Sequence, residues 1–129
     1  MNRWKWVFRI SIFSIGLGLL LHSDDNVYAA KGYGQRLATQ LQLIKVRPEQ
    51  NKAFQRHTKR YYRQLNNAPR KVMSTRRGDF HTMIKREVKS SGKQAVKNLE
   101  DVLDEDQLKH FRRYIKIAGD NYVASLGID

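Results

Sequence analysis

The spacing of the apolar residues most constrains the fold of this chain, because they recur every three or four positions over most of residues 33–126. This period matches the 3.6 residues per turn of an α-helix. No segment alternates apolar and polar residues with the β-branched enrichment that is typical of a strand. The pattern therefore predicts an all-α fold.

The two prolines divide the N-terminal half into predicted helices. The first helix covers about residues 33–44. Pro48 suits the first turn of a second helix, where the N–H that proline lacks has no partner in any case. This second helix runs to about residue 66, because Asn66-Asn67-Ala68-Pro69 is typical of a break. Residues 72–78 form either a short helical turn or a basic loop.

The C-terminal half predicts a long third helix over about residues 79–102, with Ser90-Ser91-Gly92 expected to weaken or bend its middle. Asp104 is a favourable N-cap for a fourth helix, which Gly127 ends. The short joint at residues 103–104 predicts that these two helices form a long antiparallel hairpin. We expect four helices in all.

The N-terminus has the three parts of a cleavable secretory signal. Arg3, Lys5 and Arg9 precede an uncharged, mainly apolar segment over residues 10–21, and Val27-Tyr28-Ala29 suits a cut before Ala30. Twelve apolar residues are too few to cross a bilayer, which requires roughly 20. We therefore expect residues 1–29 to be removed, residues 30–129 to form one helical domain, and the protein to be exported to the periplasm.

The full chain has a net charge of +13. Beyond the predicted signal, this charge is unevenly distributed. Residues 30–93 hold 17 basic and three acidic residues, whereas residues 94–129 hold five basic and seven acidic residues. This imbalance predicts an anionic partner. The chain has no cysteine to staple a thin core, so we expect a homodimer.

Two helix starts share a pattern, in which an aliphatic residue precedes a cap position and a glutamine follows three residues after the cap. The first is Val46-Arg47-Pro48-Glu49-Gln50, and the second is Leu103-Asp104-Glu105-Asp106-Gln107. In the second, Asp104 and Gln107 have the spacing of a capping box. In the first, arginine is a poor N-cap.

These residues resemble the doubled Leu-Thr-x-x-Gln motif of the Spy/CpxP family of periplasmic chaperones and stress sensors. The layout of residues 35–123 is similar as well, although Val46 replaces leucine and Arg47 and Asp104 replace threonine. The resemblance implies a curved antiparallel hairpin dimer. It also implies ATP-independent capture of unfolded polypeptides on a concave basic face.

Basic residues interleaved with aromatic residues predict a surface that binds unfolded or acidic protein segments. Positive charge speeds the capture of acidic chains, and tyrosine offers apolar area with a polar tip. A solvated helix face that only keeps the protein soluble is the alternative reading. The candidate binding residues are Phe54, Arg56, Lys59, Arg60, Tyr61, Tyr62, Arg63, Phe80 and Lys85.

Catalytic and metal-binding patterns are absent from the sequence. It has no cysteine nucleophile, phosphate-binding glycine loop or His-Glu-x-x-His helix, and no two histidines have i, i+4 spacing. We therefore expect neither an enzyme nor a metal or other cofactor. Export makes nucleic acid an unsuitable physiological partner. The alternative function is a cationic envelope protein that binds anionic lipid or polysaccharide.

Overall fold

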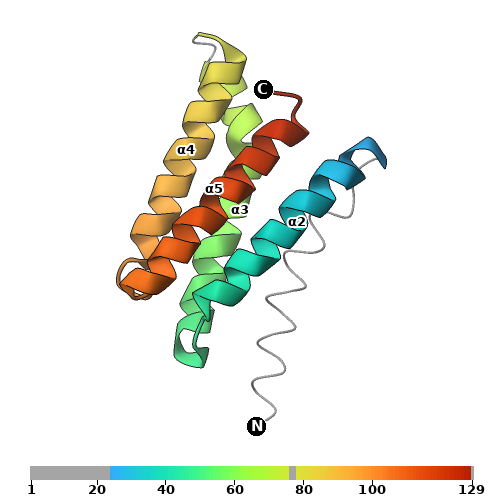
Figure 1. Ribbon diagram of the computed structural model, residues 1–129. Coiled ribbons are helices and arrows are strands. Elements are labelled where there is room, and N and C mark those ends of the chain that lie inside the picture. Colours follow the sequence, from blue (N-terminus) through green and yellow to red (C-terminus); the bar gives the residue numbers. More distant parts are fainter. Residues whose placement is uncertain (1–23, 76–77, 129) are drawn as a thin grey trace.

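The computed structural model describes residues 24–75 and 78–128, with side chains from residue 32 onward. This part of the chain forms helices α2 (Asp24–Ile44), α3 (Pro48–Thr75), α4 (Phe80–Leu99) and α5 (Glu105–Ser125) (Figure 1). Helices α2 and α4 run opposite to α3 and α5, and backbones approach most closely between α2 and α5, α3 and α4, and α4 and α5. The all-α class and the antiparallel α4–α5 hairpin are confirmed, whereas the homodimer stays a prediction.

Most of the predicted signal peptide lies outside the described residues, so its removal also stays a prediction. Among the helices that the structure describes, none combines the length and apolar character needed to cross a membrane.

The predicted break at residues 66–69 is wrong, because α3 continues through Pro69 to Thr75. Proline in a helix interior removes a hydrogen bond and usually costs about 3 kcal/mol or more. The helix continues because its apolar stripe continues on both sides of Pro69. Ala68 and Val72 are both buried, one turn apart, and extend the face that Leu65 begins. Of residues 72–78, those up to Thr75 are therefore helical.

Helix α4 continues through Ser90-Ser91-Gly92 without interruption, and the small size of Gly92 serves the packing between helices. A Cβ atom at Gly92 would lie 2.8 Å from Ile115 Cγ2, and one at Gly119 would lie 3.0 Å from Val88 Cγ1. The Tyr61 side chain lies near both glycines, with its hydroxyl 3.3 Å from the Cβ position of Gly119. The two glycines therefore let α4 and α5 approach closely around a tyrosine from α3.

We expect Gly92→Ala to destabilise the protein by about 1–2 kcal/mol. Overpacking costs about 1–3 kcal/mol, and the higher helix propensity of alanine returns at most about 1 kcal/mol. The midpoint of urea unfolding, followed by circular dichroism, measures the change. Gly32→Ala is the control, since nothing lies within 4 Å of its Cβ position. Equal midpoints for Gly92→Ala and the unsubstituted protein would contradict this account.

The core lies where α3, α4 and α5 converge, and α2 covers α5. Its largest fully buried side chains are Tyr61, Tyr114, Phe111, Leu37, Ile44, Leu65, Ile84 and Leu99. The predicted end of the last helix is confirmed, because α5 ends at Ser125 and Gly127 follows with φ +73°. Glycine reaches this left-handed conformation without a steric cost.

Candidate functional site

The two glutamines of the doubled motif meet in the interior. Gln50 at the start of α3 and Gln107 at the start of α5 are only 5% and 6% exposed. Gln50 Nε2 donates to Gln107 Oε1 at 2.9 Å, and Gln107 Nε2 donates to Gln50 Oε1 at 2.8 Å. The two amides therefore form a cyclic, doubly hydrogen-bonded pair that joins positions 57 residues apart.

Gln107 also caps its own helix, as the sequence predicts. Its backbone N–H donates to Asp104 Oδ1 at 2.9 Å, and the Asp104 N–H donates to Gln107 Oε1 at 3.0 Å. The second hydrogen of its amide goes to the Lys45 carbonyl at 3.2 Å, in the turn between α2 and α3. The predicted capping box is thus confirmed, and the same side chain links two turns.

Gln50 repeats this arrangement in the other turn. The Arg47 N–H donates to Gln50 Oε1 at 3.0 Å, and Gln50 Nε2 donates to the Val102 carbonyl at 2.8 Å. Arg47 contributes no side-chain cap, as expected for arginine. Its guanidinium instead lies 3.7 Å from Asp104 Oδ2 and 3.5 Å from Glu49 Oε1. All four amide hydrogens of the glutamine pair have acceptors, which buried amides require.

An approximate twofold relation follows from these contacts, because each hydrogen bond of one glutamine side-chain amide has a counterpart on the other. The relation extends along both helices to Phe54 and Phe111, whose ring centroids lie 5.6 Å apart with planes at 63°. It is also present in the sequence, since Gln-x-Lys-x-Phe-x-Arg-x-x-Lys occurs at residues 50–59 and again at 107–116. The five-residue motif at each of the two helix starts is therefore part of a longer repeat.

Two of the candidate binding residues lie in the core, so their predicted place on a binding surface is wrong. Phe54 is 3% exposed and Tyr61 is 1% exposed, so neither side chain reaches a partner of the folded protein. Phe54 packs edge-on against Phe111, and the Tyr61 hydroxyl donates to the Ile115 carbonyl at 3.2 Å. Both residues lie on the apolar stripe of α3, and large aromatic side chains on such a stripe are used for packing.

Tyr62 is partly buried. Its hydroxyl lies 2.7 Å from the hydroxyl of Tyr114, so one phenol donates to the other. Burial raises the pKa of Tyr62 and of Tyr114 above the usual value of 10. Burial also raises the pKa of Tyr61. These phenols join α3 to α5 and remain protonated at neutral pH.

The basic candidates on α3 are exposed and share its outer face. Arg56, Lys59 and Arg63 are separated by three or four residues, which places them on one side of the helix. Arg60 lies beside them. Phe54 faces the core, and 100° per residue turns Arg56 to the opposite side of α3. The structure therefore gathers these four cations into one surface, which we call the α3 basic face.

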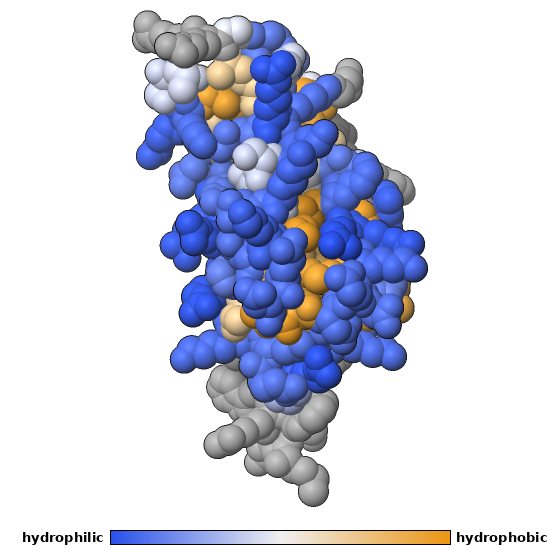
Figure 2. Space-filling model, turned by 90° about the vertical axis from the view of Figure 1, so that its left-hand side faces the viewer, coloured by the Kyte–Doolittle hydropathy of each residue, from blue (hydrophilic) through white to orange (hydrophobic). Residues whose placement is uncertain are grey.

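Phe80 and Lys85 are both exposed on α4, but five residues separate them, so they lie about 140° apart around the helix. Phe80 is 39% exposed at the first residue of that helix, and Met73, in the last turn of α3, is 65% exposed. Both flank the turn between α3 and α4, so exposed apolar area gathers beside this turn. Figure 2 shows further apolar atoms along a seam bordered by hydrophilic side chains.

The histidines form no metal site in residues 24–75 and 78–128, where no three acidic or histidine side chains cluster suitably. Burial, followed by the charges of Arg56 and Arg60, lowers the pKa of His57. His110 Nδ1 lies 3.3 Å from Gln40 Oε1, between α5 and α2. His110 therefore links α5 to α2.

Comparison with known proteins found no match to a family model, to a curated protein or to a solved structure. The resemblance to the Spy/CpxP family therefore stays a prediction that rests on the motif residues and on the helical layout.

Proposed function

We propose that the protein is an exported, ATP-independent binding protein of the chaperone type, which captures acidic segments of unfolded polypeptides in the periplasm. The observation that carries this proposal is the α3 basic face, Arg56, Lys59, Arg60 and Arg63. No acidic residue occurs between Glu49 and Asp79. Among the described residues, none of the four ion pairs uses a cation of this face. Its charge is available to an acidic chain.

Apolar contact would follow the electrostatic capture. Met73 and Phe80, the exposed apolar side chains beside the α3–α4 turn, offer area to an unfolded segment. Exposed apolar groups rimmed by polar residues are typical of interaction sites. Methionine suits varied partners because its unbranched side chain adapts to irregular surfaces.

Suppression of the aggregation of a chemically denatured, acidic client tests the proposal. We expect suppression at low salt that weakens several-fold as salt rises, because exposed charges are screened beyond about 10 Å at 0.1 M. The variant Arg56→Glu/Arg60→Glu/Arg63→Glu should remove most of it. The control Arg86→Glu/Lys93→Glu/Lys97→Glu changes the net charge equally on α4 and should retain most of it. No suppression at several-fold molar excess would refute the proposal.

A cationic envelope protein that binds anionic lipid or polysaccharide is the second candidate. It is favoured by Lys85, Lys89, Lys93 and Lys97, which recur every four residues and therefore share one side of α4. Co-sedimentation with anionic vesicles, without an effect on client aggregation, would support this function in place of the first.

A further inference from the structure

The repeat of residues 50–59 and 107–116 includes three cations as well as the buried glutamine and phenylalanine. Lys52, Arg56 and Lys59 on α3 correspond to Lys109, Arg113 and Lys116 on α5, and all six are exposed. Within each set the cations follow one another at four and three residues. Each set therefore spans about 10 Å along one side of its helix, at 1.5 Å per residue.

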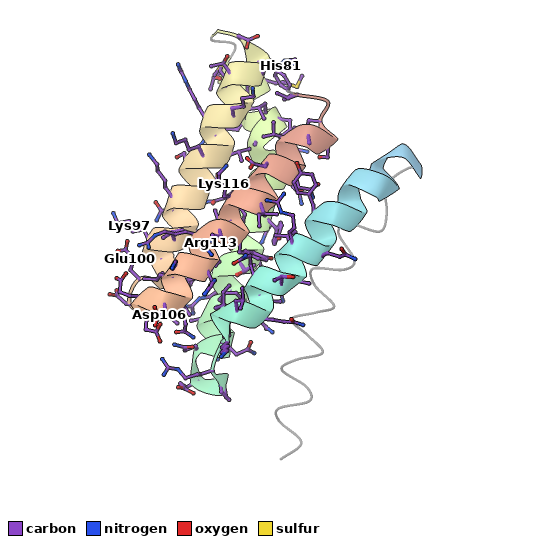
Figure 3. The ribbon with its side chains drawn as sticks, viewed as in Figure 1. His81, Lys97, Glu100, Asp106, Arg113 and Lys116 are labelled. Atoms are coloured by element: carbon purple, nitrogen blue, oxygen red, sulfur yellow. The ribbon has the colours of Figure 1, made fainter. Side chains whose placement is uncertain are left out.

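The two sets lie on opposite sides of the molecule. Phe54 and Phe111 contact each other between α3 and α5, and in each helix the arginine two residues later is turned about 200° away from that contact. Figure 1 shows α5 in front of α3, and Figure 3 shows Arg113 and Lys116 on α5. The glutamine pair thus holds two equivalent cationic surfaces in a fixed back-to-back arrangement.

One turn further along each helix, the two surfaces differ in their net positive charge. Arg63 on α3 corresponds to Asp120 on α5, and Lys116 Nζ donates to Asp120 Oδ2 at 3.2 Å. Arg60, which is exposed, corresponds to Ile117, which is buried. The α3 surface is therefore extended by two further cations, whereas the α5 surface is partly neutralised by a carboxylate.

We propose that each chain binds two acidic polypeptide segments, one along each surface, and that the α3 surface binds more tightly. The choice of an acidic polypeptide as the partner rests on the proposed function. The number and placement of the two surfaces rest on the repeat. Alternate side chains of an extended polypeptide lie about 6.6 Å apart, close to the step of about 6 Å between the first two cations and about 2 Å longer than the step of about 4.5 Å to the third. Carboxylates on one side of an extended segment therefore meet successive cations. One chain would bridge two segments of an unfolded client.

Titration of the full chain with a fluorescent twelve-residue peptide of alternating glutamate and serine tests the inference at low salt. Calorimetry should give two peptides per chain, with dissociation constants that differ several-fold. Arg56→Glu/Lys59→Glu should remove the tighter event, and Arg113→Glu/Lys116→Glu should remove the weaker event. Asp120→Asn should tighten the weaker event. The control Lys93→Glu/Lys97→Glu on α4 should preserve both events.

One peptide per chain, or equal weakening by all three double charge reversals, would overturn the two-surface proposal. Tighter binding to polyphosphate of matched charge, or to anionic vesicles, would overturn the choice of an acidic polypeptide as partner. The proposed chaperone function fails independently, because two peptides can bind a chain that does not suppress aggregation. Circular dichroism establishes that each variant is folded before it is titrated.

Discussion

Gln107→Glu should destabilise the protein by about 2–4 kcal/mol while leaving the start of α5 capped. Glutamate serves as well as glutamine in a capping box, so the Asp104 N–H keeps its acceptor. The carboxylate cannot donate to Gln50 Oε1 or to the Lys45 carbonyl, which are both acceptors of the Gln107 amide. A buried group that loses its partner costs about 1–3 kcal/mol, and here a charge is buried as well.

Urea unfolding at neutral pH measures this loss, and two further variants separate its causes. Asp104→Ala removes the cap and keeps the glutamine pair, so it should cost only about 1 kcal/mol. Gln50→Ala and Gln107→Ala should be strongly non-additive, with a coupling energy of about 1–3 kcal/mol in a double-mutant cycle. Additive effects would mean that the amide pair contributes little to joining the α2–α3 turn to the α4–α5 turn.

The stability of the protein should fall steeply as pH rises in the alkaline range. Tyr61, Tyr62 and Tyr114 have pKa values raised above 10, and burial is the main cause for each. The unfolded chain loses these protons near pH 10, whereas the folded chain keeps them to higher pH. The free energy of unfolding is therefore unaffected by the ionisation of these three tyrosines below pH 10 and falls as pH rises above it. The limiting slope is about 4 kcal/mol per pH unit, because each of the three groups contributes about 1.36 kcal/mol.

Absorbance of phenolate and far-ultraviolet circular dichroism, recorded in one pH titration, should show ionisation and unfolding together. Tyr62→Phe/Tyr114→Phe removes two of these groups, so it should lower the slope of stability against pH by about 2.7 kcal/mol per pH unit. Ionisation of all tyrosines near pH 10 without loss of helix would contradict the burial of this cluster.

Local chemistry in the sequence predicted much of the helical framework. Asp104 and Gln107 predicted the capping box because its bonds join residues only three apart. Pro48 and Gly127 marked a helix start and a helix end for equally local reasons. The alternation of exposed and buried positions along α3 follows the same short-range rule, so the outer position of Arg56, Arg60 and Arg63 could also be predicted.

Contacts between distant residues decided the rest. Pro69 and Gly92 are unfavourable in an isolated helix, but burial of Ala68 and Val72 and close contact with Ile115 retain them in α3 and α4. Phe54 and Tyr61 were predicted to contact a partner, because aromatic side chains have the same spacing on a binding face as in a core. Only tertiary packing distinguishes these uses.

The doubled glutamine motif shows most clearly which features local sequence determines and which features tertiary packing decides. The sequence by itself determined that Gln50 and Gln107 each lie in the first turn of a helix. The tertiary structure decided that they face each other, because only helix packing brings the α2–α3 turn against the α4–α5 turn and buries both amides. Since a buried amide must find partners for its donors and acceptors, the two glutamines satisfy one another across 57 residues.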